Sequence, residues 1–283
     1  MKIAVMTDST ANLPKHIIEK YQIPVAPLSV TFDDGETFTE HPDLSKESFY
    51  KKMAASKTIP TTSQPAIGEV ISLLHHLKNE AFDNVIIITL SSGISGYFST
   101  VNAISDEVSG LKVWPFDSLI TSVPMGTMVE VALDLAKKNV SPEEIIKKLE
   151  EIRAEMKAYM IVDDLNHLVR GGRLTNGAAL IGGLLKIKPV LTFEEGKIVV
   201  AEKIRTSRKA FNRIEDLLLE KAANNASDYR FFIIHANALE QAEEEKARLL
   251  SRNPNLQIDL AYFGPVIGTH LGEKALGFGW VKK

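Results

Sequence analysis

Apolar residues in the first half of the chain form short runs that alternate with segments of helical spacing. Residues 3–6 and 85–90 are nearly uninterrupted apolar runs, a pattern typical of strands buried on both faces of a parallel sheet. Residues 66–77 instead carry apolar side chains three and four positions apart, which predicts a helix. The repeated order of strand and helix predicts a parallel sheet with helices on its faces.

The second half of the chain mixes strands and helices in a different order. Residues 194–197, Glu-Glu-Gly-Lys, join two strand-like runs and predict a hairpin. Further strands are predicted at 159–162, 187–193, 198–204, 231–235, 258–263 and 276–281, and helices at 164–169, 178–185, 207–223 and 239–250. We therefore predict an α/β fold with an N-terminal parallel α/β sheet domain over residues 1–157 and a C-terminal mixed α+β domain over residues 158–283. We expect close packing of the domains, because no long linker separates them.

Polar residues follow the predicted strands of the first half, at 7–10, 91–96 and 117–118. In open α/β sheets, ligands bind in the crevice outside the carboxyl ends of the strands. The sequence therefore predicts a ligand site at this edge of the N-terminal sheet.

Composition narrows the class of protein. The 283 residues carry a formal net charge of −3, which argues against a general nucleic-acid binder, and the absence of cysteine excludes disulfides and thiolate metal sites. The seven histidines form no H-x-x-x-H or H-E-x-x-H pair, so we expect no metal and no cofactor. No apolar stretch approaches the roughly 18 residues of a membrane helix, and we expect a cytoplasmic protein.

The segment Ser-Ser-Gly-Ile-Ser-Gly at 91–96 admits several interpretations. It matches neither nucleotide-binding glycine fingerprint, and a plain tight turn or a site for a phosphosugar or phospholipid remains open. It is also a near miss to the G-x-S-x-G nucleophile elbow, with a tyrosine where the second glycine belongs. A serine hydrolase built here would use Ser95, His270 and either Asp8 or Asp117.

Two further polar segments are candidate sites. Residues 60–65, Pro-Thr-Thr-Ser-Gln-Pro, place hydroxyls before a predicted helix, either as a cap or as donors to an anion. His270 lies among small residues that suit close packing at a cleft. Arg173 and Arg205 stand next to turns, where they are either solvated or dock a phosphorylated ligand or an acidic partner.

Five of these segments together resemble the DegV family over nearly the whole chain. They are Thr7-Asp8-Ser9-Thr10, Thr62-Ser63-Gln64-Pro65, Ser91-Ser92-Gly93-Ile94-Ser95-Gly96, Gly171-Gly172-Arg173-Leu174 and Gly264-Pro265-Val266-Ile267-Gly268-Thr269-His270, in the order and spacing of that family. One departure is Tyr97, where relatives usually have threonine. We expect this tyrosine to reshape the pocket mouth or the chain preference.

The resemblance implies a binding protein without catalytic residues of its own. A long-chain fatty acid such as palmitate would lie in a tunnel between two domains, with its carboxylate held by Thr62 and Ser95 and supported by His270. The family also implies a monomer that presents this carboxylate to a separate fatty acid kinase subunit, which makes acyl phosphate for phospholipid synthesis. The family further implies that an arginine in the region of Arg205 serves partner docking or phosphoryl handling, and Arg173 is a second candidate for that role from its place beside a turn.

Elementary energetics agree with such a ligand. About 14 methylenes at roughly 0.8 kcal/mol each gain about 11 kcal/mol on leaving water, a gain that lost freedom partly offsets. A buried carboxylate needs hydrogen-bond donors, which Thr62, Ser95 and His270 can supply. The apolar stretch 178–185 is expected either to form a tunnel wall or simply to belong to the domain core.

Overall fold

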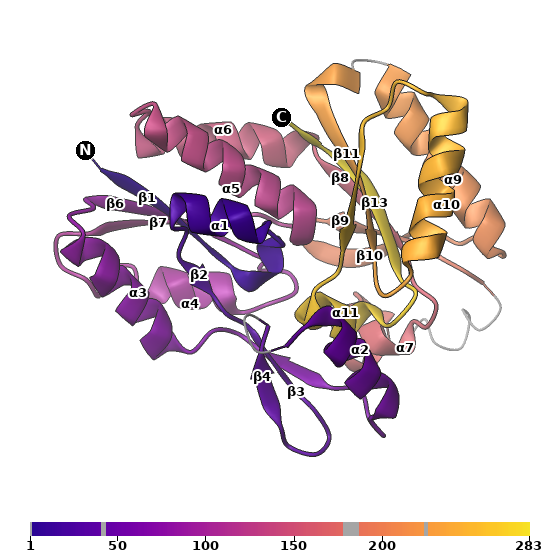
Figure 1. Ribbon diagram of the computed structural model, residues 1–283, viewed down its shortest axis with the longest axis horizontal. Coiled ribbons are helices and arrows are strands. Elements are labelled where there is room, and N and C mark those ends of the chain that lie inside the picture. Colours follow the sequence, from indigo (N-terminus) through magenta and orange to yellow (C-terminus); the bar gives the residue numbers. More distant parts are fainter. Residues whose placement is uncertain (1, 41–43, 178–186, 224–225) are drawn as a thin grey trace.

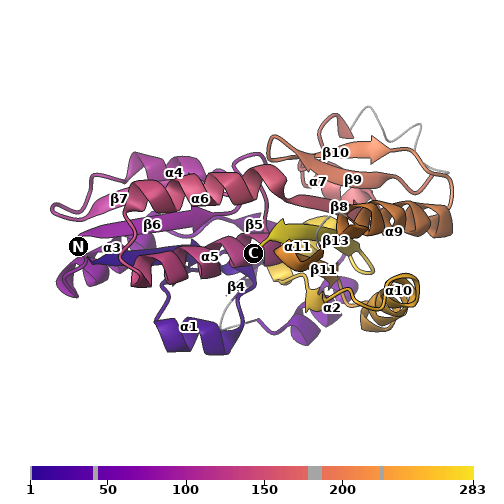
Figure 2. The same ribbon diagram turned by 90° about the horizontal axis from the view of Figure 1, so that it is seen from above.

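The chain forms two lobes that lie side by side (Figures 1 and 2). The computed structural model describes residues 2–40, 44–177, 187–223 and 226–283. The N-terminal lobe is built on a parallel sheet in the order β2-β1-β6-β7, formed by β1 (Ile3–Asp8), β2 (Val25–Ala26), β6 (Asn84–Thr89) and β7 (Lys112–Asp117). Its helices are α1 (Lys15–Tyr21), α3 (Ile67–Asn79), α4 (Tyr97–Ala103), α5 (Ser122–Lys137) and α6 (Pro142–Glu155). Every residue of β6 is buried, as the apolar run predicted.

The C-terminal lobe is built on a mixed sheet in the order β10-β9-β8-β13-β11-β12. Its strands are β8 (Lys157–Ile161), β9 (Val190–Glu194), β10 (Lys197–Glu202), β11 (Tyr229–His235), β12 (Ile258–Tyr262) and β13 (Leu276–Lys282). The predicted hairpin joins β9 to β10 as an antiparallel pair. The other elements of this lobe include the helices α7 (Asn166–Arg170), α9 (Ser207–Ala223), α10 (Leu239–Arg252) and α11 (Pro265–Leu271) and the short 3₁₀ helix η2 (Ala226–Asp228). The predicted α/β class, with one parallel and one mixed sheet, is confirmed.

Alternation along the strands gives the mixed sheet two apolar faces. Tyr159 of β8 and Ile233 of β11 belong to the core under α9 and α10, whereas Met160 and Phe232 point to the opposite face and join the core of the N-terminal lobe. Because successive side chains on a strand point to opposite sides, a sheet covered on both faces must be apolar at successive positions. One face of the C-terminal sheet therefore points toward the N-terminal lobe.

A small antiparallel sheet in the order β4-β3-β5 was not predicted. It consists of β3 (Ser29–Thr31), β4 (Thr37–Thr39) and β5 (Thr61–Ser63), and the helix α2 (Lys46–Ala55) lies between β4 and β5 in the chain. Residues 60–65 were interpreted as a helix cap or as donors to an anion and not as a strand, but Thr62 pairs with Val30 in register. The segment is short and bounded by prolines, so only its distant pairing partner makes it a strand.

The helix α11 was also missed, although the sequence carries its signals. Pro265 occupies the first turn and Gly272, with φ 77°, ends the helix, which is the usual placement of proline and glycine. α11 packs against α2, β3, β5 and α7, so it joins the C-terminal segment to the small sheet. This contact connects residues from opposite ends of the chain.

The two lobes are closely apposed, as expected. The indole N–H of Trp280 in β13 donates to the carbonyl of Glu155 at the end of α6, at 2.9 Å. β13 also packs against α5 and α6. The predicted division after residue 157 stays a prediction, since β8 already begins at Lys157.

In the described ranges, no helix is both long and apolar enough to cross a membrane.

Candidate functional site

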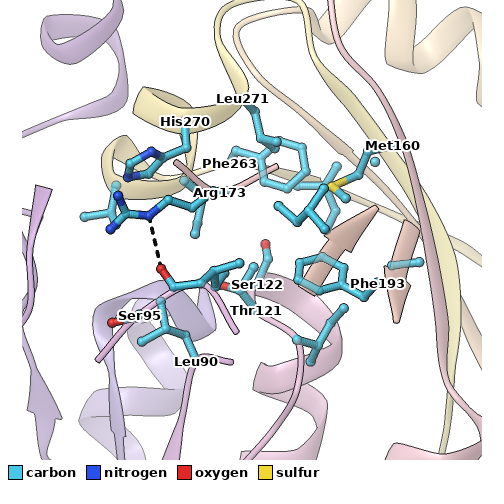
Figure 3. Close-up of a pocket in the computed structure, with 18 of the residues that line it drawn as sticks. Leu90, Ser95, Thr121, Ser122, Met160, Arg173, Phe193, Phe263, His270 and Leu271 are labelled. Atoms are coloured by element: carbon cyan, nitrogen blue, oxygen red, sulfur yellow. Dashed lines mark hydrogen bonds between the residues drawn. The ribbon is translucent and has the colours of Figure 1, made fainter. Parts of the chain in front are cut away.

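A cavity of about 230 Å³ lies between the two sheets, at the carboxyl ends of the N-terminal strands. We call it the central cavity; its volume falls just below the roughly 300–1,000 Å³ of typical small-molecule sites. Its apolar wall includes Ala158, Met160, Phe193, Phe232 and Ile234 from the inner face of the mixed sheet. Figure 3 shows Met160 and Phe193 of this wall opposite a polar end that holds Ser95, Arg173 and His270. The location agrees with the edge that the strand-end loops predicted.

Thr62 and His270 meet at the polar end. The Thr62 Oγ1 atom lies 2.8 Å from His270 Nε2, although 208 positions separate the two residues. Thr62 is held by the pairing of β5 with β3, and His270 by the packing of α11 on both strands. The predicted proximity of these two residues is therefore a direct contact in the structure.

His270 is electrically neutral at pH 7. Burial lowers its pKa to about 4, and the electrostatic interactions with Arg173 and His167 act in the same direction. Its Nδ1 atom is buried and has no hydrogen-bond partner among the described residues. A proton on Nε2 avoids a buried N–H without an acceptor, and the ring then donates to Thr62. The threonine O–H is thereby left to donate into the cavity.

Ser95 supplies a second hydroxyl at this end. It lies in the loop between β6 and α4, and its Oγ accepts the backbone N–H of Tyr97 at 3.2 Å. A hydroxyl that accepts one hydrogen bond keeps its own proton for another partner. Because Ser95 is only half-buried and lines the cavity, a ligand at the polar end can accept that proton.

Arg173 brings a positive charge to the same end of the cavity. Its Nε donates to the carbonyl of Ile94 at 3.2 Å, the bond that Figure 3 marks, and its Nη1 donates to the carbonyl of Gly171. Burial lowers the pKa of Arg173. The residue therefore belongs to the cavity wall, beside the loop that carries Ser95, and its predicted role toward a partner stays a prediction.

Gly171 allows His270 to approach this segment closely. A Cβ atom at position 171 would lie 2.5 Å from His270 Nδ1, and real Cβ atoms do not come so near. Only glycine leaves space for the imidazole at this point. The Gly-Gly-Arg motif thus has two local functions, which are to admit His270 and to position Arg173.

The hairpin between β9 and β10 is fastened to the loop of Ser95. Ser91 Oγ donates to the carbonyl of Gly196 at 2.6 Å and accepts the N–H of Gly93 at 3.1 Å. A Cβ atom on Gly93 would collide with the Gly196 carbonyl. The glycine-serine turn therefore allows close contact between the lobes beside the site.

Two buried carboxyl groups lie in the fold behind the site. Burial raises the pKa of Asp8 to about 6 and that of Glu40 to about 7. Glu40 accepts hydrogen bonds from the hydroxyl of Ser9 at 2.6 Å and from the N–H of Val266 at 3.1 Å. It thus connects the loop after β1 to the start of α11, a role that no sequence signal indicated.

Two predicted residues lie outside the cavity wall. Arg205 is exposed in the turn before α9, so its proposed part in partner docking rests on exposure alone. Tyr97 was expected to reshape the pocket mouth, but it is fully buried at the start of α4 and does not line the central cavity. The side chain of Tyr97 points into the hydrophobic core and not into the central cavity, so its ring does not narrow the cavity.

The geometry does not assemble the residues of a serine hydrolase into a triad. His270 Nε2 is bonded to Thr62, and no carboxylate in the described part of the chain orients its Nδ1. Asp8 instead accepts from Thr10 and Leu90, and Asp117 accepts from Ser92 and Leu119. A triad requires the base to be oriented by the third residue, and these contacts show no such arrangement.

Several residues at the cavity were missed by reasoning from the sequence. Thr121, the N-cap of α5, and Ser122, its first residue, line the cavity wall, and Gln64 lines it beside Thr62. Thr121 and Ser122 follow a strand-end loop, which was the available signal. The stretch 178–185, expected to wall the tunnel, lies outside the described residues. Within the described ranges, no group of three or more His, Cys, Asp or Glu residues could hold a metal ion.

Comparison with known proteins places this geometry in a family. A profile of the family described as "Uncharacterised protein, DegV family" matches residues 2–283. A DegV domain-containing protein of Listeria monocytogenes is 46% identical over 279 residues, which cover 99% of this chain and 98% of the relative. Protein DegV of Bacillus subtilis is 47% identical over 284 residues, with both chains covered completely.

Solved structures show the same architecture. The crystal structure of DegV, a fatty acid binding protein from Bacillus subtilis, superposes with a TM-score of 0.92 over 100% of both chains. A fatty acid binding DegV family protein from Streptococcus agalactiae, 38% identical, gives a TM-score of 0.94 over 100% of this chain and 99% of that one. The sequence match and the shared fold agree over the whole length, and the chain belongs to the DegV family.

Proposed function

We propose that this chain binds one long-chain fatty acid in the central cavity, with the carboxylate at Thr62, Ser95, His270 and Arg173. The observation that carries the proposal is the polarity of the cavity, which is apolar along the mixed sheet and rich in donors at one end. The fatty acid binding described for the B. subtilis and S. agalactiae relatives supports it. The acyl chain gains up to about 11 kcal/mol from burial, and the donors offset the cost of desolvating the carboxylate.

The donors at the polar end suit an anion. Thr62 and Ser95 each keep a hydroxyl proton for the ligand, and Arg173 adds a positive charge that a neutral His270 does not provide. Hydrogen bonds to a charged group contribute about 1.5–3 kcal/mol each. A carboxylate bound there therefore has partners of the kind that a buried anion requires.

The position of the donors also suits presentation of the carboxylate to a second protein. Gln64 and Gly96 beside the polar end are exposed, whereas Met160 and Phe232 at the apolar end are buried. In the proposed reaction a separate kinase subunit phosphorylates the exposed carboxylate to acyl phosphate for phospholipid synthesis. This chain would act as a monomeric, non-catalytic carrier, and exposed Arg205 would contact the kinase.

Mass spectrometry of ligand extracted from the purified protein tests the binding proposal directly. We expect a long-chain fatty acid such as palmitate at about one per chain; a phosphosugar or an intact phospholipid would contradict the proposal. A fluorophosphonate probe tests the hydrolase alternative, and stoichiometric labelling of Ser95 would overturn the non-catalytic role. Transfer of γ-phosphate from ATP to the bound acid, only when the kinase subunit is added, tests the partnership.

A further inference from the structure

Two hydroxyl groups in the wall of the central cavity are not used by the proposed carboxylate site. Thr121 and Ser122 lie where the chain passes from β7 into α5, and both line the cavity. Figure 3 places them between the polar end at Ser95 and the apolar end at Met160 and Phe193. Thr121 is 6% exposed and Ser122 is 2% exposed, so both side chains are more than nine-tenths buried.

Neither hydroxyl oxygen has a hydrogen-bond partner among the residues that the structure describes. Buried polar groups in native proteins are nearly always paired with protein, water or ligand. The other hydroxyls of the cavity wall considered above do have partners, since Thr62 contacts His270 and Ser95 accepts from Tyr97. Thr121 and Ser122 therefore require a partner that enters the cavity.

The helix itself does not use these hydroxyls. Thr121 is the N-cap of α5, a position whose hydroxyl normally accepts an N–H from the second or third helical residue. The third residue is Pro124, which has no N–H, and no side-chain cap bond forms. By contrast, Ser141 at the start of α6 is fully engaged in a capping box with Glu144. Ser122 adopts φ 62°, a left-handed conformation that is uncommon for serine.

The surroundings restrict what this partner can be. Ile120 and Pro124 flank the two hydroxyls along the wall, and Phe193 lies toward the apolar end. The start of a 16-residue helix carries a partial positive charge, which favours an electron-rich atom. A purely hydrocarbon chain passing this point would leave both O–H groups against methylenes.

We propose that the central cavity accepts a fatty acid with an oxygen substituent on its chain, such as a hydroxyl or keto group, at the point where the chain passes Thr121 and Ser122. The proposal rests on the proposed fatty acid function and specifies its substrate class. A hydroxyl on the ligand can accept from one of these residues and donate to the other, whereas a keto oxygen can accept from both. The pair then acts as a specificity-determining site within an otherwise apolar channel.

Titration calorimetry with a panel of acids tests the proposal. The panel contains palmitic and stearic acid together with their 3-hydroxy, 10-hydroxy and 12-hydroxy derivatives, because the oxygen position along the chain is to be located. We expect at least one hydroxylated acid to bind the wild type about tenfold more tightly than its parent acid, the effect of one net hydrogen bond. In the Thr121→Val/Ser122→Ala double variant this advantage should disappear, with the affinity for the parent acid unchanged or higher.

A matched control comes from the same helix. Thr127 is buried in α5, donates its hydroxyl to the carbonyl of Val123 at 3.0 Å and does not line the cavity, so Thr127→Val should retain the preference. The inference is overturned if every hydroxylated acid binds the wild type no better than its parent, a result that needs no variant to fold. It is also overturned if the double variant still prefers the hydroxylated acid over its parent acid. The same holds if the double variant loses affinity for all acids equally, a result that would indicate that the two hydroxyls hold an ordered water. Failure of the parent acids themselves to bind the wild type would instead refute the proposed function, and this inference with it.

Discussion

Replacing Thr62 by valine isolates one donor of the proposed carboxylate site. The substitution keeps the shape and the β-branched character that suit β5, and it removes the oxygen that lies 2.8 Å from His270 Nε2. If Thr62 donates to a carboxylate, the lost hydrogen bond is of the charge-assisted kind, worth about 1.5–3 kcal/mol. The affinity for palmitate should then fall by roughly 10- to 150-fold.

The assay is displacement of a fluorescent fatty acid by palmitate, repeated with hexadecan-1-ol. The alcohol has the same chain but no charge, so its affinity should fall by a smaller factor. Thr61→Val is the matched control, because Thr61 precedes Thr62 in β5, is exposed and does not line the cavity. Equal affinities of the two variants for palmitate would refute the assignment of Thr62, provided that both are fully folded at the assay temperature.

Three further predictions concern the groups that hold the site in place. Burial raises the pKa of Glu40 from 4.5 to about 7, so the folded state binds this proton more tightly than the unfolded state. Its contribution, up to about 3 kcal/mol, is therefore present below pH 4.5 and is lost as the pH rises to 7. Urea unfolding at pH 5 and pH 8 should show that the free energy of unfolding falls less between these two pH values in Glu40→Gln than in the wild type. An identical pH dependence of the two proteins would contradict the raised pKa of Glu40. Tyr97→Phe should leave the free energy of unfolding unchanged or raise it by about 1 kcal/mol, because the buried Tyr97 hydroxyl has no partner among the described residues; a clear loss of stability would show that a partner exists. Gly93→Ala should destabilise by about 1–3 kcal/mol in thermal or urea unfolding through its collision with Gly196, whereas Gly68→Ala, with open space in α3, should not; equal effects would disprove the close contact.

Glu40 and His270 respond to pH in opposite directions. Burial lowers the pKa of His270 to about 4, so the unfolded state binds the histidine proton more tightly and stability is lost as the pH falls from 6.5 toward 4. Glu40 has the reverse dependence. The comparison of Glu40→Gln with the wild type separates the two, because the histidine contribution is common to both proteins.

Local patterns were sufficient where the physical cause is local. The buried run at 85–90 is β6, the hairpin at 194–197 forms between β9 and β10, and the spacing over 66–77 is α3, because each pattern follows from burial or turn geometry within one segment. The strand-end rule also predicted the edge of the sheet at which the central cavity lies, since parallel strands bring their carboxyl ends to one edge. By contrast, β5 was missed because three residues between prolines become a strand only by pairing with β3.

The sequence by itself determined the family and the two kinds of sheet, and the family resemblance predicted Thr62, Ser95 and His270 as the carboxylate-binding residues. Only the tertiary structure decided that Thr62 contacts His270, that Arg173 lines the cavity while Arg205 lies outside it, and that Tyr97 is buried in the core. The same is true of the unpaired hydroxyls of Thr121 and Ser122. Hydrophobic periodicity depends only on residues that are close in the sequence, so it can be read from the sequence alone. Which donors share a cavity, and which of them lack partners, depends on contacts between residues as far as 208 positions apart, and packing alone fixes those contacts.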